Sequence, residues 1–330
     1  MKRIQEDIKN GTFCRLYLLF GEETYLKQQY KQKLLQAWNP DGDTMNFHHL
    51  EGKGIDIRQL IDLCETMPFF ADYRIILIEN SGFFKNKTEV LADYLKTLPD
   101  FVRLLFVESE VDKRNRMYKA VKDLGHAAEF GRQDEKTLMR WAAAVLNKEG
   151  KRITQRDMEL FLTKTGTDMG NIRMELEKLL NYTMGRDVVT ADDIEAICTT
   201  QTENRIFEMV RAVTERNQKR ALELYYDLLT LKEAPMRILF LLARQFQQML
   251  SILQYQEEGL SQQEMAARLG VPSFVIRNLS ACARAYSISS LQQAVEDFVS
   301  AEEDVKTGRL GDTLSVELLI IRYSSQGKQR

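Results

Sequence analysis

The sequence predicts an α/β domain with a parallel sheet at its N-terminal end, followed by two all-helical domains. Short apolar runs alternate with helical patterns over roughly the first 130 residues, which is typical of a chain that alternates strands and helices. After Gly131 the strand signals stop, and every later apolar pattern has helical spacing. We therefore expect an α/β domain over residues 1–131, a small helical domain over 132–201 and a second helical domain over 202–330.

The apolar runs of the first domain are continuous rather than alternating, as in strands that helices cover on both faces. The runs and two shorter candidates are Arg15–Phe20, Asn46–Leu50, Tyr73–Ile78, Val102–Val107 and Ala127–Phe130. Helical patterns fill the intervals, for example through Leu60 and Cys64 before the third run. The order of these elements predicts an open, doubly wound sheet.

Helix-start signals recur in the two later domains. The capping pairs are Thr154 with Asp157, Thr190 with Asp193, and Ser261 with Glu264. Pro235 breaks the helical pattern of the last domain before a long helix. The final segment SSQGKQR, residues 324–330, is expected to be disordered.

The composition excludes several classes of protein. The formal net charge is −2 at pH 7, so contact with DNA needs a local basic patch or help from partners. The N-terminus MKRIQEDIKNGTF lacks a signal-peptide core, and no run reaches the ~18 apolar residues that span a bilayer, so we expect a cytoplasmic protein. The cysteines form no CxxC pair and there are only 3 histidines, so we expect no disulfide and no metal site.

A degenerate phosphate-binding loop follows the first predicted strand. In the pattern G-x-x-x-x-G-K-[ST], Gly21 takes the first glycine position and Lys27 the lysine position. Leu26 replaces the second glycine, and Gln28 replaces the hydroxyl that would bind Mg²⁺. Glu79, after a later strand, is interpreted as a loop carboxylate rather than a Mg²⁺ ligand. We therefore expect no nucleotide cofactor and no catalytic site.

A second feature is the apolar segment Met67-Pro68-Phe69-Phe70, between a predicted helix and the strand at Tyr73. Pro68 disfavours a helical backbone at Met67 and favours a turn. Two adjacent phenylalanines in a turn cannot easily both face inward, and aromatic side chains beside Met are typical of interface hot spots. The alternative, that both rings pack on the sheet edge as core, is equally compatible with the residues.

Two further segments are candidates for contact with DNA or a partner. Residues 264–279 resemble a helix-turn-helix, but Phe274, Val275 and Ile276 occupy the turn that would need polar residues to read bases. Packing inside a helical domain is the favoured interpretation, and contact of Phe274 and Arg277 with a DNA end is the alternative. The basic residues of segment 110–116 are interpreted as a solvated helix start.

An ordered set of segments resembles one known family. LYLLFGEETYLKQQY is similar to its opening strand-turn-helix, LFVESEVDKRNRMYKAVK to the end of its first domain, and NIRMELEKLLNY to its lid. VTADDIEAICTTQTENRIFEMVRAV resembles its lid-to-collar junction, while APMRILFLLARQFQQML and AEEDVKTGRLGDTLSVELLIIRY resemble its collar helices. This family is the delta subunit of the bacterial DNA polymerase III clamp loader, and the resemblance covers nearly the whole chain.

The resemblance implies an AAA+-like first domain, a helical lid, and a helical collar for oligomerisation, in a subunit that is not itself an ATPase. It also implies a clamp-binding element, an apolar pair at the end of a helix just before a strand. Met67, Pro68, Phe69 and Phe70 match this element, with Pro68 where a small polar residue is expected. The implied partners are the beta sliding clamp, the gamma/tau ATPase subunits, delta-prime, and primed DNA through the assembled complex, with no membrane.

We therefore expect a subunit that binds the sliding clamp and helps to open it without hydrolysing ATP. Two alternatives come from other classes of protein. One is an active P-loop ATPase of the AAA+ class, which Leu26 and Gln28 oppose. The other is a helix-turn-helix DNA-binding regulator, which the apolar turn at Phe274 opposes.

Overall fold

The computed structural model describes residues 2–86, 88–199, 202–271 and 273–325. The chain divides into two compact units, residues 1–133 and 134–330. The first unit ends close to the predicted end of the α/β domain, whereas the division of the second unit into two helical domains stays a prediction. Across the described ranges, none of the helices combines the length and apolar character needed to cross a bilayer.

The described part of the first unit contains one parallel sheet of five strands in the order β2-β3-β4-β1-β5. The strands are β1 (Leu16–Phe20), β2 (Phe47–Glu51), β3 (Arg74–Glu79), β4 (Val102–Glu108) and β5 (His126–Glu129). Every predicted run becomes a strand, with ends shifted by at most one residue. The central strands β1 and β3 are buried at every position, which explains why their sequences do not alternate.

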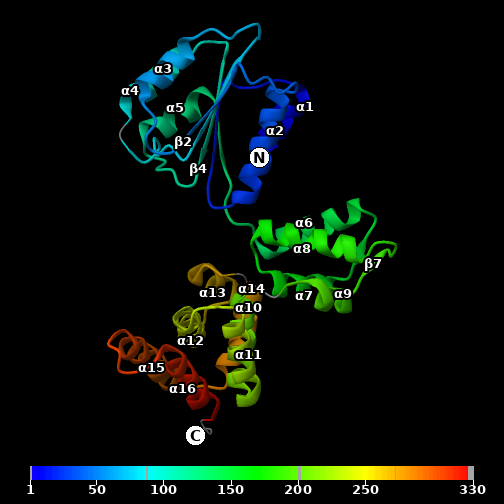
Figure 1. Ribbon diagram of the computed structural model, residues 1–330, viewed down its shortest axis with the longest axis vertical. Coiled ribbons are helices and arrows are strands. Elements are labelled where there is room, and N and C mark those ends of the chain that lie inside the picture. Colours follow the sequence, from blue (N-terminus) through cyan, green and yellow to red (C-terminus); the bar gives the residue numbers. More distant parts are fainter. Residues whose placement is uncertain (1, 87, 200–201, 272, 326–330) are drawn as a thin grey trace. The chain divides into compact units, whose positions relative to one another are not determined.

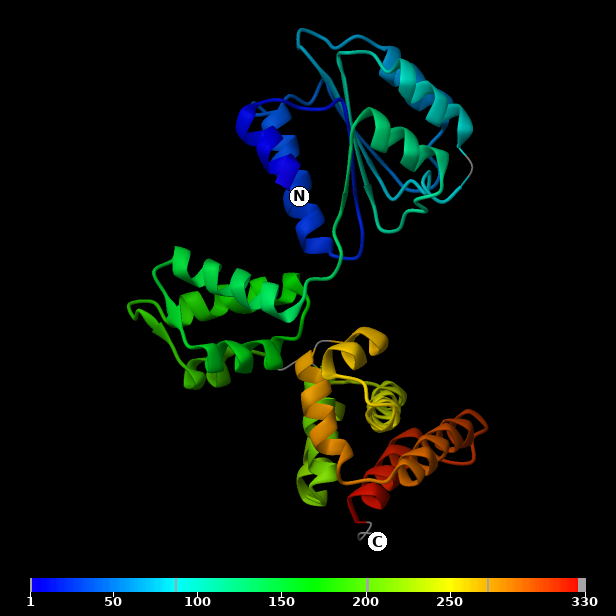
Figure 2. The same cartoon turned by 180° about the vertical axis from the view of Figure 1, so that it is seen from behind.

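Helices cover both faces of this sheet (Figures 1 and 2). They are α1 (Lys2–Asn10), α2 (Thr24–Trp38), α3 (Ile57–Glu65), α4 (Glu89–Tyr94), the short 3₁₀ helix η1 (Leu95–Thr97) and α5 (Arg116–Leu124). Successive residues of a strand pack into the cores on opposite faces of the sheet. Leu18 belongs to the core with α3, α4 and α5, and Leu19 belongs to the core with α1 and α2. The doubly wound prediction is confirmed, although α1 was not predicted.

The second unit is mostly helical, and its described residues form one large apolar core among the later helices. The helices are α6 (Glu135–Lys148), α7 (Gln155–Thr165), α8 (Met169–Tyr182), α9 (Ala191–Ile197), α10 (Thr202–Thr214), α11 (Gln218–Thr230), α12 (Pro235–Glu257), α13 (Gln262–Leu269), α14 (Ser273–Ala283), α15 (Ile288–Lys306) and α16 (Asp312–Ser325). The start signals at Thr154, Thr190 and Ser261 cap α7, α9 and α13. The predicted helix starts are therefore confirmed.

Two details of the second unit differ from the predictions, whereas the predicted break at Pro235 before a long helix is confirmed. The strands β6 (Arg152–Ile153) and β7 (Val188–Val189) form a short parallel pair, so the unit is not all-helical. Pro235 is the first residue of α12, where its fixed φ suits the helix start. Ser324 and Ser325 belong to α16 rather than to a disordered tail, and residues 326–330 lie outside the described residues.

Candidate functional site

Residues 66–73, which join α3 to β3, form an exposed apolar turn. The side chains of Met67, Phe69 and Phe70 are 73%, 58% and 95% exposed. The two rings contact each other edge to face, with centroids 4.6 Å apart. The prediction that at least one ring projects is confirmed, and the alternative that both rings belong to the core is wrong, because both rings are mostly exposed. Pro68 lies between Met67 and Phe69, near the start of the turn.

The backbone of the turn adopts an unusual conformation at its most exposed residue. Phe70 has a φ of 50°, in the left-handed region that residues with a Cβ rarely occupy. This conformation costs of the order of 1–3 kcal/mol and persists only when the surroundings hold it. The turn must therefore be fixed by contacts from outside its own segment.

Asn46, just before β2, supplies the first of these contacts. Its side chain is only 3% exposed. Its Oδ1 accepts a hydrogen bond from the main-chain N–H of Phe69 at 2.6 Å, and its Nδ2 donates to the main-chain oxygen of Phe69 at 2.9 Å. The same Nδ2 donates to Asp43 at 2.6 Å, and this bond is the main cause that lowers the pKa of the Asp43 carboxyl. Asn46 thus holds Phe69 by both of its main-chain polar groups.

Arg74, the first residue of β3, supplies the second contact. Its guanidinium is buried and donates to the main-chain oxygens of Thr66 and Met67, both at 2.8 Å. A cation is favourable here because these carbonyls follow the C-terminal end of α3. A third guanidinium nitrogen lies 2.5 Å from Nε2 of His48, and burial, followed by the Arg74 charge, lowers the pKa of that imidazole.

Two more exposed apolar side chains flank the turn. Met45 precedes Asn46, and Tyr73 precedes Arg74. The Tyr73 ring is covered on one side by the guanidinium of Arg103, whose central carbon lies 3.9 Å from the ring centroid. Met45 and Tyr73 therefore add exposed apolar side chains next to the two residues that hold the turn.

Most of the degenerate phosphate-binding motif is helical in the structure, which leaves only a short connection between β1 and α2. Because α2 begins at Thr24, Leu26, Lys27 and Gln28 are helical, and only residues 21–23 connect β1 to α2. A Cβ at Gly21 would lie 2.4 Å from the main-chain oxygen of Phe130, and its φ is 118°, so this glycine serves tight chain packing. The carboxylate of Glu23 caps the start of α2 by accepting from the N–H of Tyr25. This helix start is therefore occupied by the chain's own acid, where a phosphate would otherwise bind.

The charged groups near this connection are engaged inside the domain. Lys27 is buried, and its Nζ donates to the main-chain oxygen of Glu108 at 3.1 Å. Burial lowers the pKa of Lys27. Glu79, at the end of β3, forms ion pairs with Lys31 and His49, both at 3.0 Å. Glu79 is therefore a buried, paired carboxylate rather than the loop carboxylate that we predicted, because the Lys31 ammonium compensates its loss of water.

The connection at Gly21 and the apolar turn lie at opposite ends of the parallel strands. All strands are parallel, so the connection at Gly21 follows the C-terminal end of a strand, whereas the apolar turn precedes the N-terminal end of β3. Contacts at one edge therefore do not share side chains with contacts at the other.

The predicted DNA-contact residues lie on α14. Ile276 in its first turn is fully buried, Phe274 is half-buried, and Arg277 is exposed, with its guanidinium 3.7 Å from the carboxylate of Glu135. Pro272 lies outside the described residues. Packing of this helix is confirmed at Ile276, while DNA contact by Phe274 and Arg277 stays a prediction. In segment 110–116 the basic side chains pair with acids of the same unit.

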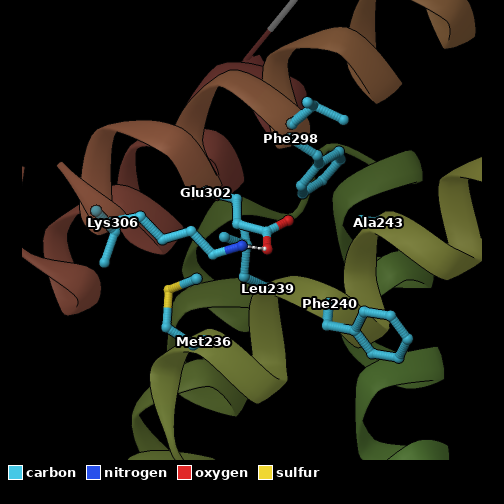
Figure 3. A pocket seen from close by; sticks show the side chains of 9 residues that line it. Met236, Leu239, Phe240, Ala243, Phe298, Glu302 and Lys306 are labelled. Carbon is cyan, nitrogen blue, oxygen red and sulfur yellow. Dashed lines mark hydrogen bonds and ion pairs between the residues drawn. The ribbon is translucent and has the colours of Figure 1, made fainter.

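Sequence reasoning missed an apolar groove between α12 and α15 (Figure 3). It has a volume of about 340 Å³. Its lining residues are Met236, Leu239, Phe240, Ala243, Phe298, Val299, Glu302, Val305 and Lys306. Phe240 and Val299 remain largely exposed, and Lys306 pairs with Glu302 across one helical turn beside the groove. The signal that could have revealed the groove was one apolar residue outside the buried face of each helix, Phe240 in α12 and Val299 in α15.

Comparison with known proteins gives consistent matches along the chain. The family model described as DNA polymerase III, delta subunit, matches residues 17–130, and the model of the DNA polymerase III delta subunit, C-terminal domain, matches residues 203–323. The DNA polymerase III subunit delta of Bacillus subtilis is 25% identical over 341 residues, covering 99% of this chain and 97% of the relative. The probable DNA polymerase III subunit delta of Aquifex aeolicus is 21% identical over 258 residues, covering 74% of this chain and 72% of the relative.

A solved structure has the same fold. The Bacillus subtilis DNA clamp loader delta protein YqeN superposes with a TM-score of 0.68 and 23% identity, covering 98% of this chain and 99% of that chain. At this identity the likeness establishes the fold, while the two family models establish the kinship.

Proposed function

Because the chain belongs to the DNA polymerase III delta subunit family, the clamp-loader delta subunits, we propose that it binds the beta sliding clamp through its apolar turn. The observation that carries this proposal is the exposure of Phe69 and Phe70 on a backbone held by buried groups. Aromatic anchors on a fixed scaffold are typical of interface hot spots. The two rings enter an apolar pocket of the clamp, with Met67 beside them.

Binding of this kind helps to open the ring without chemistry in this chain. A ligand shifts an equilibrium only by its different affinity for the two states. The apolar turn binds more tightly to a clamp whose neighbouring subunit interface is strained or open, and so stabilises that state. The energy comes from burial of the two rings and Met67 on the clamp.

We also propose that the chain does not hydrolyse ATP. The early start of α2, the capping carboxylate of Glu23 and the buried Lys27 support this, because a phosphate would have to displace all three. A titration with a fluorescent ATP analogue should show no saturable binding at micromolar concentrations. Micromolar affinity would contradict the proposal and favour the active ATPase.

In the assembled loader, this chain works with other subunits. The helical second unit contacts the gamma/tau ATPase subunits and delta-prime, and the groove with exposed Phe240 and Val299 is one surface available for them. The ATP state of those partners decides when the apolar turn meets the clamp, and primed DNA triggers release through the complex.

The deciding experiment measures capture of the clamp by the purified chain. Phe69→Ala/Phe70→Ala should weaken binding at least ~30-fold, since loss of an aromatic hot spot costs about 2 kcal/mol or more. Phe240→Ala is the matched control, an exposed phenylalanine in the other unit, and should bind the clamp like the parent. Unchanged capture by the double variant would refute the site.

A further inference from the structure

We propose that Asn46 and Arg74 are positioning residues for clamp binding, which hold the apolar turn in its binding conformation before the clamp arrives. The inference rests on the proposed function of the turn. It adds two buried side chains that need not touch the clamp. Neither residue is marked by the motif of the turn, because one comes from the start of β2 and the other from the start of β3.

The main chain orients the two rings. Phe69 and Phe70 are mostly exposed, and their rings contact each other. Packing on the domain therefore does little to fix the direction in which they point. Their orientation must come from the main chain that carries them, which includes the left-handed backbone at Phe70.

Asn46 holds the turn at Phe69. A buried amide side chain is costly unless its polar atoms are hydrogen-bonded. Asn46 meets this requirement with both main-chain groups of Phe69 and with Asp43. Two of its three bonds thus hold the residue next to Phe70, so the amide fixes the turn at the point where the strained backbone begins.

Arg74 holds the start of the turn. Its guanidinium is 6% exposed, and it holds the opposite end of the turn through the carbonyls of Thr66 and Met67. The planar group presents its donors in a fixed fork, which suits two adjacent acceptors. With both ends fixed, binding loses less conformational entropy than it would from a mobile loop.

The test compares Asn46→Ala with Asn115→Ala in the full-length chain. Asn115 is a matched control because its side chain also joins two segments, donating to the main-chain oxygen of Asn86 and accepting from the N–H of Met117. It caps α5, which follows the C-terminal edge of the sheet. We expect Asn46→Ala to weaken clamp binding about tenfold, and Asn115→Ala to change it less than about twofold.

A double-mutant cycle separates positioning from general loss of stability. In the Phe69→Ala/Phe70→Ala background, Asn46→Ala should weaken clamp binding no further, because there are no rings left to position. Hydrogen exchange at the Phe69 amide should be faster in Asn46→Ala than in Asn115→Ala, with no clamp present. An additive loss in the cycle, or unchanged exchange at Phe69, would overturn the inference.

A charge-swap variant keeps the test usable if Asn46→Ala folds poorly. In Asn46→Asp/Asp43→Asn, the acceptor for the Phe69 N–H and the bond between positions 43 and 46 are both retained, but the donor to the Phe69 oxygen is replaced by a buried carboxylate oxygen that repels it. We expect this variant to lose clamp affinity and protection of the Phe69 amide from hydrogen exchange together. Reduced protection with parent-like clamp affinity would count against positioning.

The outcomes also distinguish this inference from the proposed function. If Phe69→Ala/Phe70→Ala still binds the clamp, the site itself is wrong. If the double variant loses binding but Asn46→Ala binds like the parent, the site stands and only the positioning role is wrong.

Discussion

Phe70 combines two features that are unfavourable in the free chain. Its ring is almost fully exposed to water, and its backbone lies in the left-handed region. Strained residues of this kind concentrate at binding and catalytic sites, where the surrounding structure holds them. The strained backbone at Phe70 is held by the hydrogen bond that Asn46 accepts from Phe69 and the one that Arg74 donates to Met67.

Two substitutions at Phe70 separate the ring from the backbone strain. Phe70→Ala and Phe70→Gly both remove the ring, so both should lose clamp binding to a similar extent. Glycine adopts positive φ without steric cost, so Phe70→Gly should be about 1 kcal/mol more stable than Phe70→Ala. Urea unfolding measures the difference, and equal stabilities would mean that the left-handed backbone is not retained in solution.

His48 makes the turn sensitive to pH. Its pKa is lowered from 6.5 in the folded chain, so the unfolded chain binds the proton more readily. The stability that neutral His48 contributes is present above pH 6.5 and is lost as the pH falls through the lower, folded pKa. A protonated His48 also repels Arg74, so clamp affinity should fall over the same range.

The measurement compares the parent with His48→Gln, whose amide oxygen can still accept from Arg74. Unfolding free energy and clamp affinity are determined between about pH 7.5 and about pH 5.5. The parent should lose both relative to the variant as the pH falls. Parallel pH profiles for the two chains would exclude His48 as the cause.

At the scale of elements, the connection from β1 to α2 shows how a nucleotide-binding architecture is kept without its loop. Gly21 is required there by close contact with Phe130 and by its positive φ. Gly21→Ala should therefore destabilise the chain by more than ~2 kcal/mol. Gly131→Ala is the control, because a Cβ at that position meets nothing within 4 Å. Thermal unfolding of both variants checks this, and equal melting temperatures would contradict it.

The sheet could be predicted from the sequence, and some other elements could not. The strand runs were readable because helices bury both faces, so that residues 16–20 of β1 and the interior of β3, residues 75–78, contain no charged side chain. The helix α1 was missed because Ile4 is its only fully buried residue among many charged ones. The strands β6 and β7 are two residues long, which is too short to show any periodicity.

The candidate site was predictable only in its exposed part. Phe69 and Phe70 are neighbours in sequence, and Pro68 marks the turn. Asn46 bonds to main-chain atoms 23 positions away, and such atoms leave no pattern in the side chains. Similarly, Leu26 and Gln28 indicated a lost phosphate site, but the sequence did not reveal that α2 begins at Thr24 with the Glu23 side chain as its cap.

At the scale of the whole molecule, the apolar turn and the groove between α12 and α15 belong to different compact units. The first unit has its own two cores, one on each face of the sheet. A fragment of residues 1–133 should therefore bind the clamp within about threefold of the full chain, since its anchors are intact. Residues 134–330 should not capture it. Surface plasmon resonance with immobilised clamp makes the comparison, and capture by the second fragment would place the site elsewhere.

The parallel arrangement lets the two ends of the strands in the first unit differ in sequence independently of each other. A phosphate-binding loop could be introduced between β1 and α2 without changing any residue of the apolar turn. In the same way, substitutions in the connection after β1 should leave the exposed rings of Phe69 and Phe70 in place. A subunit with this sheet can therefore lack nucleotide binding and still keep the surface that we propose binds the clamp.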